Sequence, residues 1–392
     1  MTEHSFCRFL SYRVVLLLLA MALLPHPTFA MRSGEVLVRI GVVLPLKEKT
    51  SRGAKMVEFY QGLLFAVDSL RQEGISTEVQ TFHSGSSAAD IETLLAQNTL
   101  SECNVIFGPL DVVQLPAMAD YCDANGIRLV VPFSTQTTQL ANHPRYYMAS
   151  APRTIAQREA AWYIQNVFPE ANIISVETTE ANDEGFHFIH NVMNAVAEND
   201  IVVRQLQATE DETALEAVIN PGRRNLFILD SSTLKALNLT LPKLRAYKLQ
   251  HPEVEISLIG YPAWQAYTQQ FLMDFYAFDT YIFTPFYRNP LSPRVQAFDA
   301  RFARWLKSTP QATFPCYALM GFDLGYFFIR GYATYGDNLE NHLDQVPSNP
   351  LQNSFIFERQ SENDGFVNSF IEMIHYTTYQ TIDILTRNKQ AQ

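Results

Sequence analysis

Apolar runs and amphipathic helical patterns alternate along most of the chain. The run VLVRIGVVLPL at residues 36–46 is apolar at nearly every position, which is typical of a strand buried on both faces. The next segment places Phe59, Leu63 and Leu70 at helical spacing, and Gly74 marks its end. This first unit therefore predicts a strand followed by a helix.

The same unit recurs through the chain and predicts an α/β fold. Further strands are expected at residues 76–82, 104–108, 127–133, 172–177, 201–207, 225–230, 255–260 and 280–286. Helices are expected at residues 88–100, 116–126, 158–168, 186–199, 266–276, 292–308 and 317–336, with two more between 207 and 225 and between 230 and 255. Residues 354–376 have the pattern of a hairpin around 362–365. Two doubly wound, parallel-sheet lobes are the simplest arrangement of these elements.

The first thirty residues have the pattern of a secretory signal peptide. Arg8 and Arg13 precede the apolar run VVLLLLAMALL, which is about half of the ~20 residues needed to span a bilayer. Thr28-Phe29-Ala30 then provides small residues for a signal peptidase, so we expect cleavage after Ala30 and export to the periplasm or the medium. An uncleaved membrane anchor is the alternative. After cleavage no stable membrane span is expected.

Charge and cysteine content narrow the classes of partner. Acidic residues outnumber basic ones by 40 to 29, without a block of like charge, which argues against nucleic acid as a partner. Cys103 precedes a predicted strand and Cys122 lies near the end of the helix that follows it. Both ends of such a unit lie at one edge, so a Cys103–Cys122 disulfide is expected in an oxidising compartment, with two free buried thiols as the alternative.

Five stretches together resemble the type I periplasmic binding proteins, the family of leucine/isoleucine/valine-binding proteins. They are IGVVLPL, VIFGPL, PAMADYCDANGIRLVVPFST, PRYYMASAPRTIAQREAAWYI and FIFERQSENDGFVN. The resemblance covers residues 36–385 and implies two lobes joined by three crossings, near residues 151–153, 284–286 and 351–354. It also implies ligand binding between the lobes, at the carboxyl ends of strands.

The resemblance also sets the domain boundaries. The signal peptide is residues 1–30. The first lobe comprises residues 31–152 and 285–350, the second comprises 153–284 and 351–385, and 386–392 form a tail. The hairpin would then belong to the second lobe.

In the first lobe, the turn PFSTQ matches the family turn that contacts a ligand carboxylate and amine. This makes Phe133, Ser134 and Thr135 candidate ligand-binding residues, although Ser and Thr in a loop often satisfy their own backbone. The other family turn has Asp111 where a hydroxyl is expected, and we predict that Asp111 caps the helix after it.

The remaining candidates are a cation and residues of the second lobe. Arg52 belongs to a loop rich in Lys and Arg that would suit a carboxylate or a cell-wall fragment, or whose charges would only be solvated. Tyr261 and Trp264 stand where amino-acid-binding members carry an acid; they would stack on a ring or pack in the core. Ser231 lies in a polar loop that would contact the ligand or only cap a helix.

No catalytic, metal-binding or cofactor-binding motif is present in the sequence, so we expect neither an enzyme nor a cofactor. The leading hypothesis is an exported, non-enzymatic solute-binding protein that captures a small molecule for an importer or a sensor. The alternative is a scaffold of the same fold that binds an envelope protein and no small ligand, in the manner of regulators of cell-wall synthases. An open polar cavity would favour the first hypothesis, and bulky side chains in its place the second.

Overall fold

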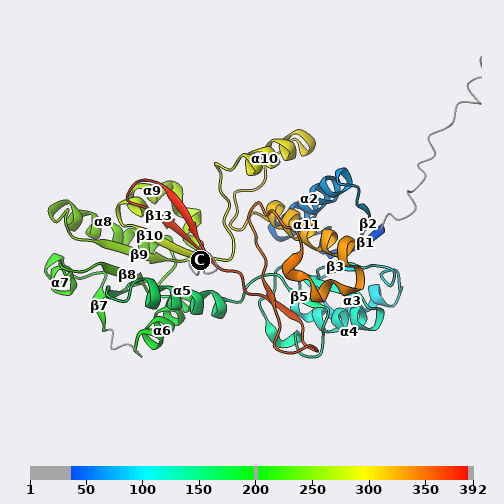
Figure 1. Ribbon diagram of the computed structural model, residues 1–392, viewed down its shortest axis with the longest axis horizontal. Coiled ribbons are helices and arrows are strands. Elements are labelled where there is room, and N and C mark those ends of the chain that lie inside the picture. The colour runs from blue at the N-terminus through cyan, green and yellow to red at the C-terminus, as the bar shows by residue number, and fades with distance from the viewer. Residues whose placement is uncertain (1–36, 198–201, 387–392) are drawn as a thin grey trace, which may run out of the picture. The chain divides into compact units, whose positions relative to one another are not determined.

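The computed structural model describes residues 37–197 and 202–386 and contains two α/β lobes, each built on its own sheet (Figure 1). Each sheet has 7 strands among the described residues, and most neighbouring strands are parallel. The predicted fold class is therefore confirmed. The predicted signal peptide lies outside the described residues.

The first sheet has the strand order β11-β12-β5-β4-β3-β1-β2. Its strands are β1 (Leu37–Leu44), β2 (Ser76–His83), β3 (Val105–Phe107), β4 (Arg128–Val131), β5 (Tyr146–Met148), β11 (Phe357–Glu358) and β12 (Phe366–Asn368). Its helices are α2 (Ser51–Gln72), α3 (Ala88–Leu95), α4 (Leu115–Asn125), α10 (Pro293–Leu306) and α11 (Tyr317–Tyr335). Helices α2 and α11 cover one face of the sheet and α3 and α4 the other (Figure 1).

The second sheet has the order β14-β13-β10-β9-β8-β6-β7. Its strands are β6 (Asn172–Glu177), β7 (Val203–Gln207), β8 (Asn225–Leu229), β9 (Ile256–Gly260), β10 (Thr280–Thr284), β13 (Glu372–Tyr376) and β14 (Ile382–Leu385). Its helices are α5 (Arg153–Val167), α6 (Asp183–Ala197), α7 (Glu212–Val218), α8 (Leu234–Gln250) and α9 (Thr268–Ala277). Helices α5 and α6 lie on one face, and α8 and α9 on the other (Figure 1).

Short 3₁₀ segments complete the described secondary structure. They are η1 (Val112–Gln114), η2 (Thr137–Gln139), η3 (Pro262–Tyr267), η4 (Gly336–Asn341) and η5 (Leu343–Gln345). Two of them, η1 and η3, directly precede helices α4 and α9. The chain therefore leaves β3 and β9 through a tight turn before each α-helix begins.

The placement of the C-terminal hairpin corrects a prediction. The hairpin forms, because β11 and β12 pair antiparallel, but β12 pairs with β5 of the first sheet rather than with the second lobe. The chain returns to the second sheet with β13, which pairs with β10, and β14 then pairs with β13. The third passage of the chain between the sheets is therefore at residues 369–371, not at 351–354.

The first lobe depends on very close packing of α2 against α11. A Cβ on Gly62 would come within 1.8 Å of the Ala318 carbonyl oxygen, and one on Gly321 within 1.9 Å of the Phe59 carbonyl oxygen. The two helices therefore meet backbone to backbone at these glycines, and side chains pack around the contact.

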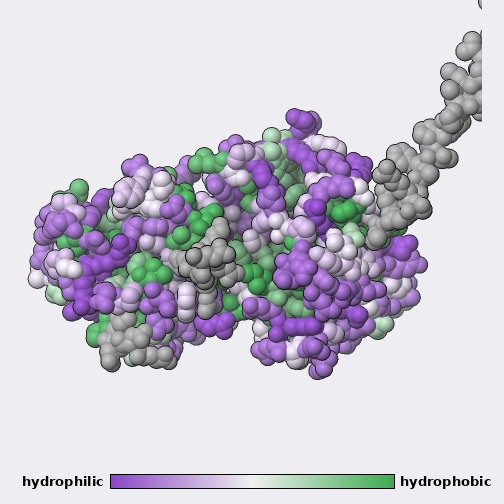
Figure 2. Space-filling view, in the orientation of Figure 1, coloured by the Kyte–Doolittle hydropathy of each residue, from purple (hydrophilic) through white to green (hydrophobic). Residues whose placement is uncertain are grey.

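The apolar side chains are concentrated in cores, and the surface seen in Figure 2 is mostly hydrophilic, with scattered hydrophobic patches. The buried clusters of the first lobe and of the second lobe share no residue. Within residues 37–197 and 202–386, every helix is too short or too polar to cross a membrane.

Candidate functional site

The first lobe carries an open depression of about 530 Å³ at the carboxyl edge of its sheet. Strands β1, β3 and β4 end beside it, and the first turn of α2 lies in its wall. Its lining residues are Ser51, Arg52, Lys55, Met56, Leu110, Asp111, Phe133 and Tyr317. The loops after parallel strands and a helix N-terminus thus converge at this place, as they do at ligand sites of open α/β sheets.

Arg52 lies in this depression but is neutralised there. Its Nη2 donates to Asp111 Oδ2, and its Nε lies 3.8 Å from Glu48 Oε2. The structure therefore brings the predicted cation to the predicted edge, but on the first turn of α2 rather than in a loop, and with a carboxylate already bound to it.

Asp111 does not have the role that we predicted for it. Its side chain makes no capping hydrogen bond to the following helical turn and pairs with Arg52 instead. A guanidinium within reach is the stronger partner, because both groups of this pair are charged whereas the backbone N–H groups are neutral. The prediction of a helix cap is therefore wrong.

Lys55 is the cation that remains available in the depression. Its ammonium lies 5.6 Å from the centroid of the Tyr317 ring, and no carboxylate pairs with it within the described residues. Phe133, a predicted ligand residue, lies beside it with its ring centroid 5.8 Å from that of Tyr317 and 5.1 Å from that of Phe59. The depression therefore combines one unpaired ammonium with an aromatic wall.

Ser134 and Thr135, which we predicted on the same turn, differ in their surroundings. Ser134 is buried, and its Oγ accepts a hydrogen bond of 3.2 Å from the Gln136 backbone N–H, so it stabilises its own turn. Thr135 is exposed. Only Phe133 of these three lines the depression.

In the second lobe, the polar groups at the carboxyl ends of β6 and β8 bind one another. The Asp230 carboxylate accepts hydrogen bonds from Thr178 N at 3.0 Å and from Thr178 Oγ1 at 2.6 Å. Burial raises the pKa of Asp230, and the bonds from Thr178 oppose that rise. Ser231, a predicted ligand residue, is fully buried and hydrogen-bonds Thr233, so its hydroxyl is already satisfied.

Tyr261 and Trp264 are core residues, so of the two alternatives that the sequence left open the structure shows core packing. Both side chains are completely buried, the Tyr261 hydroxyl donates to the Leu229 carbonyl, and the Trp264 ring lies parallel to Phe275 with centroids 5.9 Å apart. The space for the indole exists because Gly260 has no side chain. A Cβ there would lie 2.0 Å from a ring carbon of Trp264.

The expected Cys103–Cys122 disulfide is absent, since Cys103, Cys122 and Cys316 are all free and buried. Burial raises the pKa of the Cys103 thiol to about 11 and that of Cys122 well above its ordinary value. Both side chains pack in the apolar cluster under α4, so they serve as small core residues. The alternative of buried free thiols thus describes the structure.

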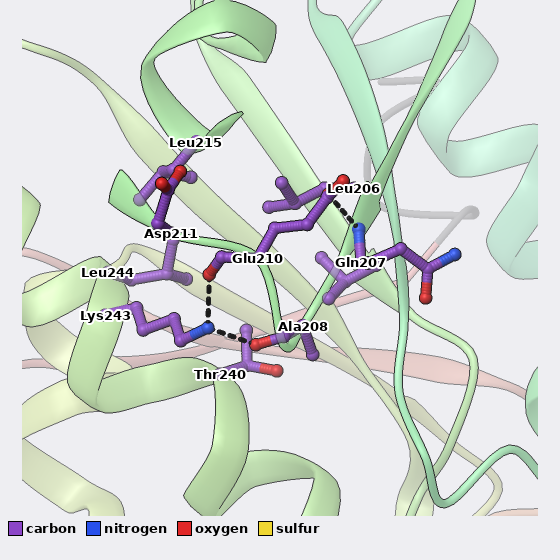
Figure 3. Close-up of a pocket in the computed structure, with 10 residues that line it drawn as sticks. Leu206, Gln207, Ala208, Glu210, Asp211, Leu215, Thr240, Lys243 and Leu244 are labelled. Carbon is purple, nitrogen blue, oxygen red and sulfur yellow. Dashed lines mark hydrogen bonds between the residues drawn. The ribbon is translucent and has the colours of Figure 1, made fainter. Parts of the chain in front are cut away.

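A second cavity, between β7 and α8, is structural. Its volume of about 10 Å³ is only enough for a single water molecule, and the Lys243 ammonium closes it by donating to the Ala208 and Glu210 carbonyls (Figure 3). No group of three or more His, Cys, Asp or Glu side chains that would suit a metal ion occurs in the described part of the chain.

Two buried residues, Asp323 and Asn368, hold the segments next to the passages between the sheets. The sequence pattern did not indicate either of them. The Asp323 carboxylate on α11 accepts backbone N–H groups from three successive residues, 351–353, at 2.7, 2.9 and 2.7 Å. The carbonyl of Gln352 in turn accepts the Tyr287 N–H at 3.0 Å. Asn368 donates to the Ala149 carbonyl at 3.0 Å. A helical Asp and a strand Asn have no signal that distinguishes them from surface residues in a single sequence.

Comparisons with solved structures show the fold. A structure from Rhodospirillum rubrum, assigned provisionally to a branched-chain amino acid ABC transporter, matches 89% of this chain and all of its own with 13% identity and a TM-score of 0.64. A branched-chain amino acid ABC transporter periplasmic ligand-binding protein from Burkholderia xenovorans matches 89% of this chain and 94% of its own, with 8% identity and a TM-score of 0.55.

An ABC transporter substrate-binding protein from Desulfitobacterium hafniense, in complex with Leu, matches 89% of this chain and 100% of its own with 15% identity and a TM-score of 0.50. No protein-family model and no curated protein matches the sequence. The architecture is thus that of the substrate-binding proteins of ABC transporters. More specifically, the chain has the type I periplasmic binding protein fold.

Proposed function

We propose that this protein is an exported solute-binding protein that holds a small ligand at the carboxyl ends of its strands. The observation that carries the proposal is the depression beside β1, β3 and β4, where Lys55 has no carboxylate partner among the described residues and Phe133 and Tyr317 form a wall. The related structures support it, because the protein from D. hafniense was solved with Leu. The N-terminal signal pattern supports export, and delivery to an importer or a sensor is part of the proposal.

The chemistry of the depression favours a ligand with one anionic group and an apolar or aromatic body. The Lys55 ammonium would meet the anion, and the first turn of α2 adds the positive end of a helix dipole. The rings of Phe133 and Tyr317 would contact the apolar part. Asp111 lies in the same wall, and its charge repels a second anionic group.

A thermal-shift screen of amino acids, aromatic carboxylates, peptides and wall fragments, followed by calorimetry of each hit, tests the proposal. A ligand that binds the folded state raises the melting temperature by mass action. Lys55→Met keeps the aliphatic stem and removes the charge, so it should weaken an anionic hit by about tenfold. Lys49→Met, at an exposed lysine in the neighbouring loop, is the matched control and should leave affinity unchanged.

The second candidate function is a scaffold that binds an envelope protein without a small ligand. In the second lobe Asp230, Ser231 and Tyr261 are all hydrogen-bonded within the protein, so their polar groups are already satisfied without a ligand. This favours the scaffold. If no compound in the screen raises the melting temperature and a purified envelope protein binds, the scaffold replaces the solute-binding proposal.

A further inference from the structure

A narrow groove lies between α2 and α10 on the first lobe and shares no lining residue with the depression. Gln61, Leu64, Phe65 and Asp68 form one wall at helical spacing on α2. Arg301, Trp305 and Leu306 form the other wall on α10. Helix α10 follows the passage out of the second sheet and packs against α2 through Phe298 and Phe302.

Trp305 is the most unusual side chain of this groove. Trp305 is 65% exposed, although its ring centroid lies 6.4 Å from that of Phe65 in the groove floor. Leu64 is also exposed, and the Arg301 guanidinium lies over the Phe65 ring at 4.9 Å from its centroid. An exposed tryptophan beside an exposed leucine and an arginine has the composition of an interface hot spot.

The size and lining of the groove select the kind of occupant. Its volume of about 180 Å³ is below the roughly 300 Å³ at which pockets for free small molecules begin. Gln61 and the Asp68–Arg301 ion pair are its only polar side chains, so a sugar or a free amino acid would leave polar groups unsatisfied. One apolar side chain projecting from a larger partner fits both limits.

The charge around the groove indicates the sign of that partner. Arg301, Arg304 and Lys307 follow one another along the end of α10, and Arg71 lies one turn beyond Asp68 on α2. Asp68, the single carboxylate in the lining, already binds Arg71 and Arg301, while Arg304 and Lys307 have no carboxylate partner within the described residues. This positive rim stands out in a chain of net charge −11.

We propose that the groove between α2 and α10 docks an acidic protein segment that inserts one large apolar side chain beside Trp305. The anchor would fill the space between Leu64, Phe65 and Trp305, and flanking carboxylates would meet Arg304 and Lys307. This surface shares no lining residue with the depression, so the proposal does not depend on the solute-binding function.

The test uses a short fluorescent probe peptide with one central leucine flanked by glutamates, titrated with the protein in an anisotropy assay. We expect saturable binding that weakens as salt is added, because the rim charges contribute to it. Trp305→Ala should lower the affinity by about tenfold or more, as removal of a hot-spot side chain does. Arg304→Glu, at an exposed position that the fold does not need, should lower it as well.

Phe186→Ala is the matched control, because Phe186 is also 65% exposed but lies on α6 of the second lobe. It should leave binding unchanged. The proposal is overturned if a probe with lysines in place of the glutamates binds equally well. It is also overturned if Trp305→Ala leaves the affinity for the probe unchanged. A dimer in sedimentation velocity that Trp305→Ala dissociates overturns it in favour of a second copy of this chain as the occupant.

Discussion

At the scale of single residues, the pairing of Arg52 decides how much this cation contributes to binding. Because Asp111 already occupies the guanidinium, Arg52→Ala should change the affinity of an anionic ligand by less than about fivefold, the value of a partly exposed pair. Asp111→Asn should instead tighten binding, since it frees the guanidinium and removes a repelling charge. Calorimetry on both variants checks this. A large loss with Arg52→Ala would show that the pair opens for the ligand.

A second prediction at this scale concerns the buried Asp323. Burial raises its pKa from 3.8 to about 7, against the opposing effect of three backbone N–H bonds and of Arg294. Between about pH 4 and pH 7 the Asp323 carboxyl is therefore protonated in the folded state and ionised in the unfolded chain. The contribution of Asp323 to the free energy of unfolding falls as the pH rises through this range, because the unfolded chain releases the proton more readily. The stability advantage of the native chain over Asp323→Asn should shrink across this range.

Urea unfolding of both proteins at several pH values measures that difference. Asp344→Asn, at an exposed aspartate, is the control and should show no such trend. An advantage that grows between pH 4 and 7 would mean that the native state holds Asp323 ionised.

The cysteines give a third prediction. Three buried free thiols should be inert to an aromatic disulfide reagent in the native protein and should all react once the mature chain is unfolded in denaturant. The protein must be purified without a reductant, because a reductant would break a Cys103–Cys122 disulfide before the assay. If Cys316 alone reacts after unfolding, Cys103 and Cys122 are joined in the exported protein.

Residue roles were less predictable than residue positions. Sequence pattern correctly placed Arg52 and Phe133 at the carboxyl edge of a sheet, because the strand ends were predicted. It could not show that Asp111 would neutralise Arg52, since the two are far apart in sequence. Nor could it show that Trp264 turns inward, which depends on the space that Gly260 leaves.

At the scale of elements, the long periodic segments were predictable and the short ones were not. Strands such as β1 and helices such as α2 carry enough apolar positions to define a period. The three residues of β5 and the exposed strand β14 do not. The pattern also joined β12 to β13 as one strand, because nothing in the apolar run marks the passage from one sheet to the other.

The contact between α2 and α11 yields a prediction for an element. Gly321→Ala would place a methyl group 1.9 Å from the Phe59 carbonyl oxygen, so the helices must separate, at a cost of about 1–3 kcal/mol in the free energy of unfolding. Gly325→Ala, one turn along the same helix, meets the side chains of Ala66 and Leu63 at 3.2 Å and Leu63 Cα at 3.5 Å, and should cost less than about 1 kcal/mol. Chemical denaturation compares the two. Equal losses would mean that the close approach is not maintained in solution.

At the scale of the whole molecule, the separate hydrophobic cores predict that the two lobes unfold as separate cooperative units. Apolar burial is the main source of stability, and the buried clusters around the first sheet are separate from the one around the second, to which Tyr287 of the passage between the sheets also belongs. Gly321→Ala should therefore lower the temperature of one unfolding transition. Phe227→Ala, in the core of the second sheet, should lower the temperature of the other. Calorimetric scans of both variants check this. A single transition that both substitutions lower equally would show that the lobes unfold together.

The same scans distinguish a ligand held by both lobes from one held by a single lobe. Binding stabilises only the units that contribute contacts, so a ligand confined to the depression of the first lobe should raise the transition that Gly321→Ala lowers and leave the other unchanged. A ligand that also contacts the second lobe should raise both transitions and bring them together, because neither unit can then unfold without releasing it. With Lys55→Met, the same ligand concentration should raise the unfolding temperature of the first lobe by less, because stabilisation grows with the logarithm of the ligand concentration over Kd. An undiminished rise in that variant would place the anionic group of the ligand away from Lys55.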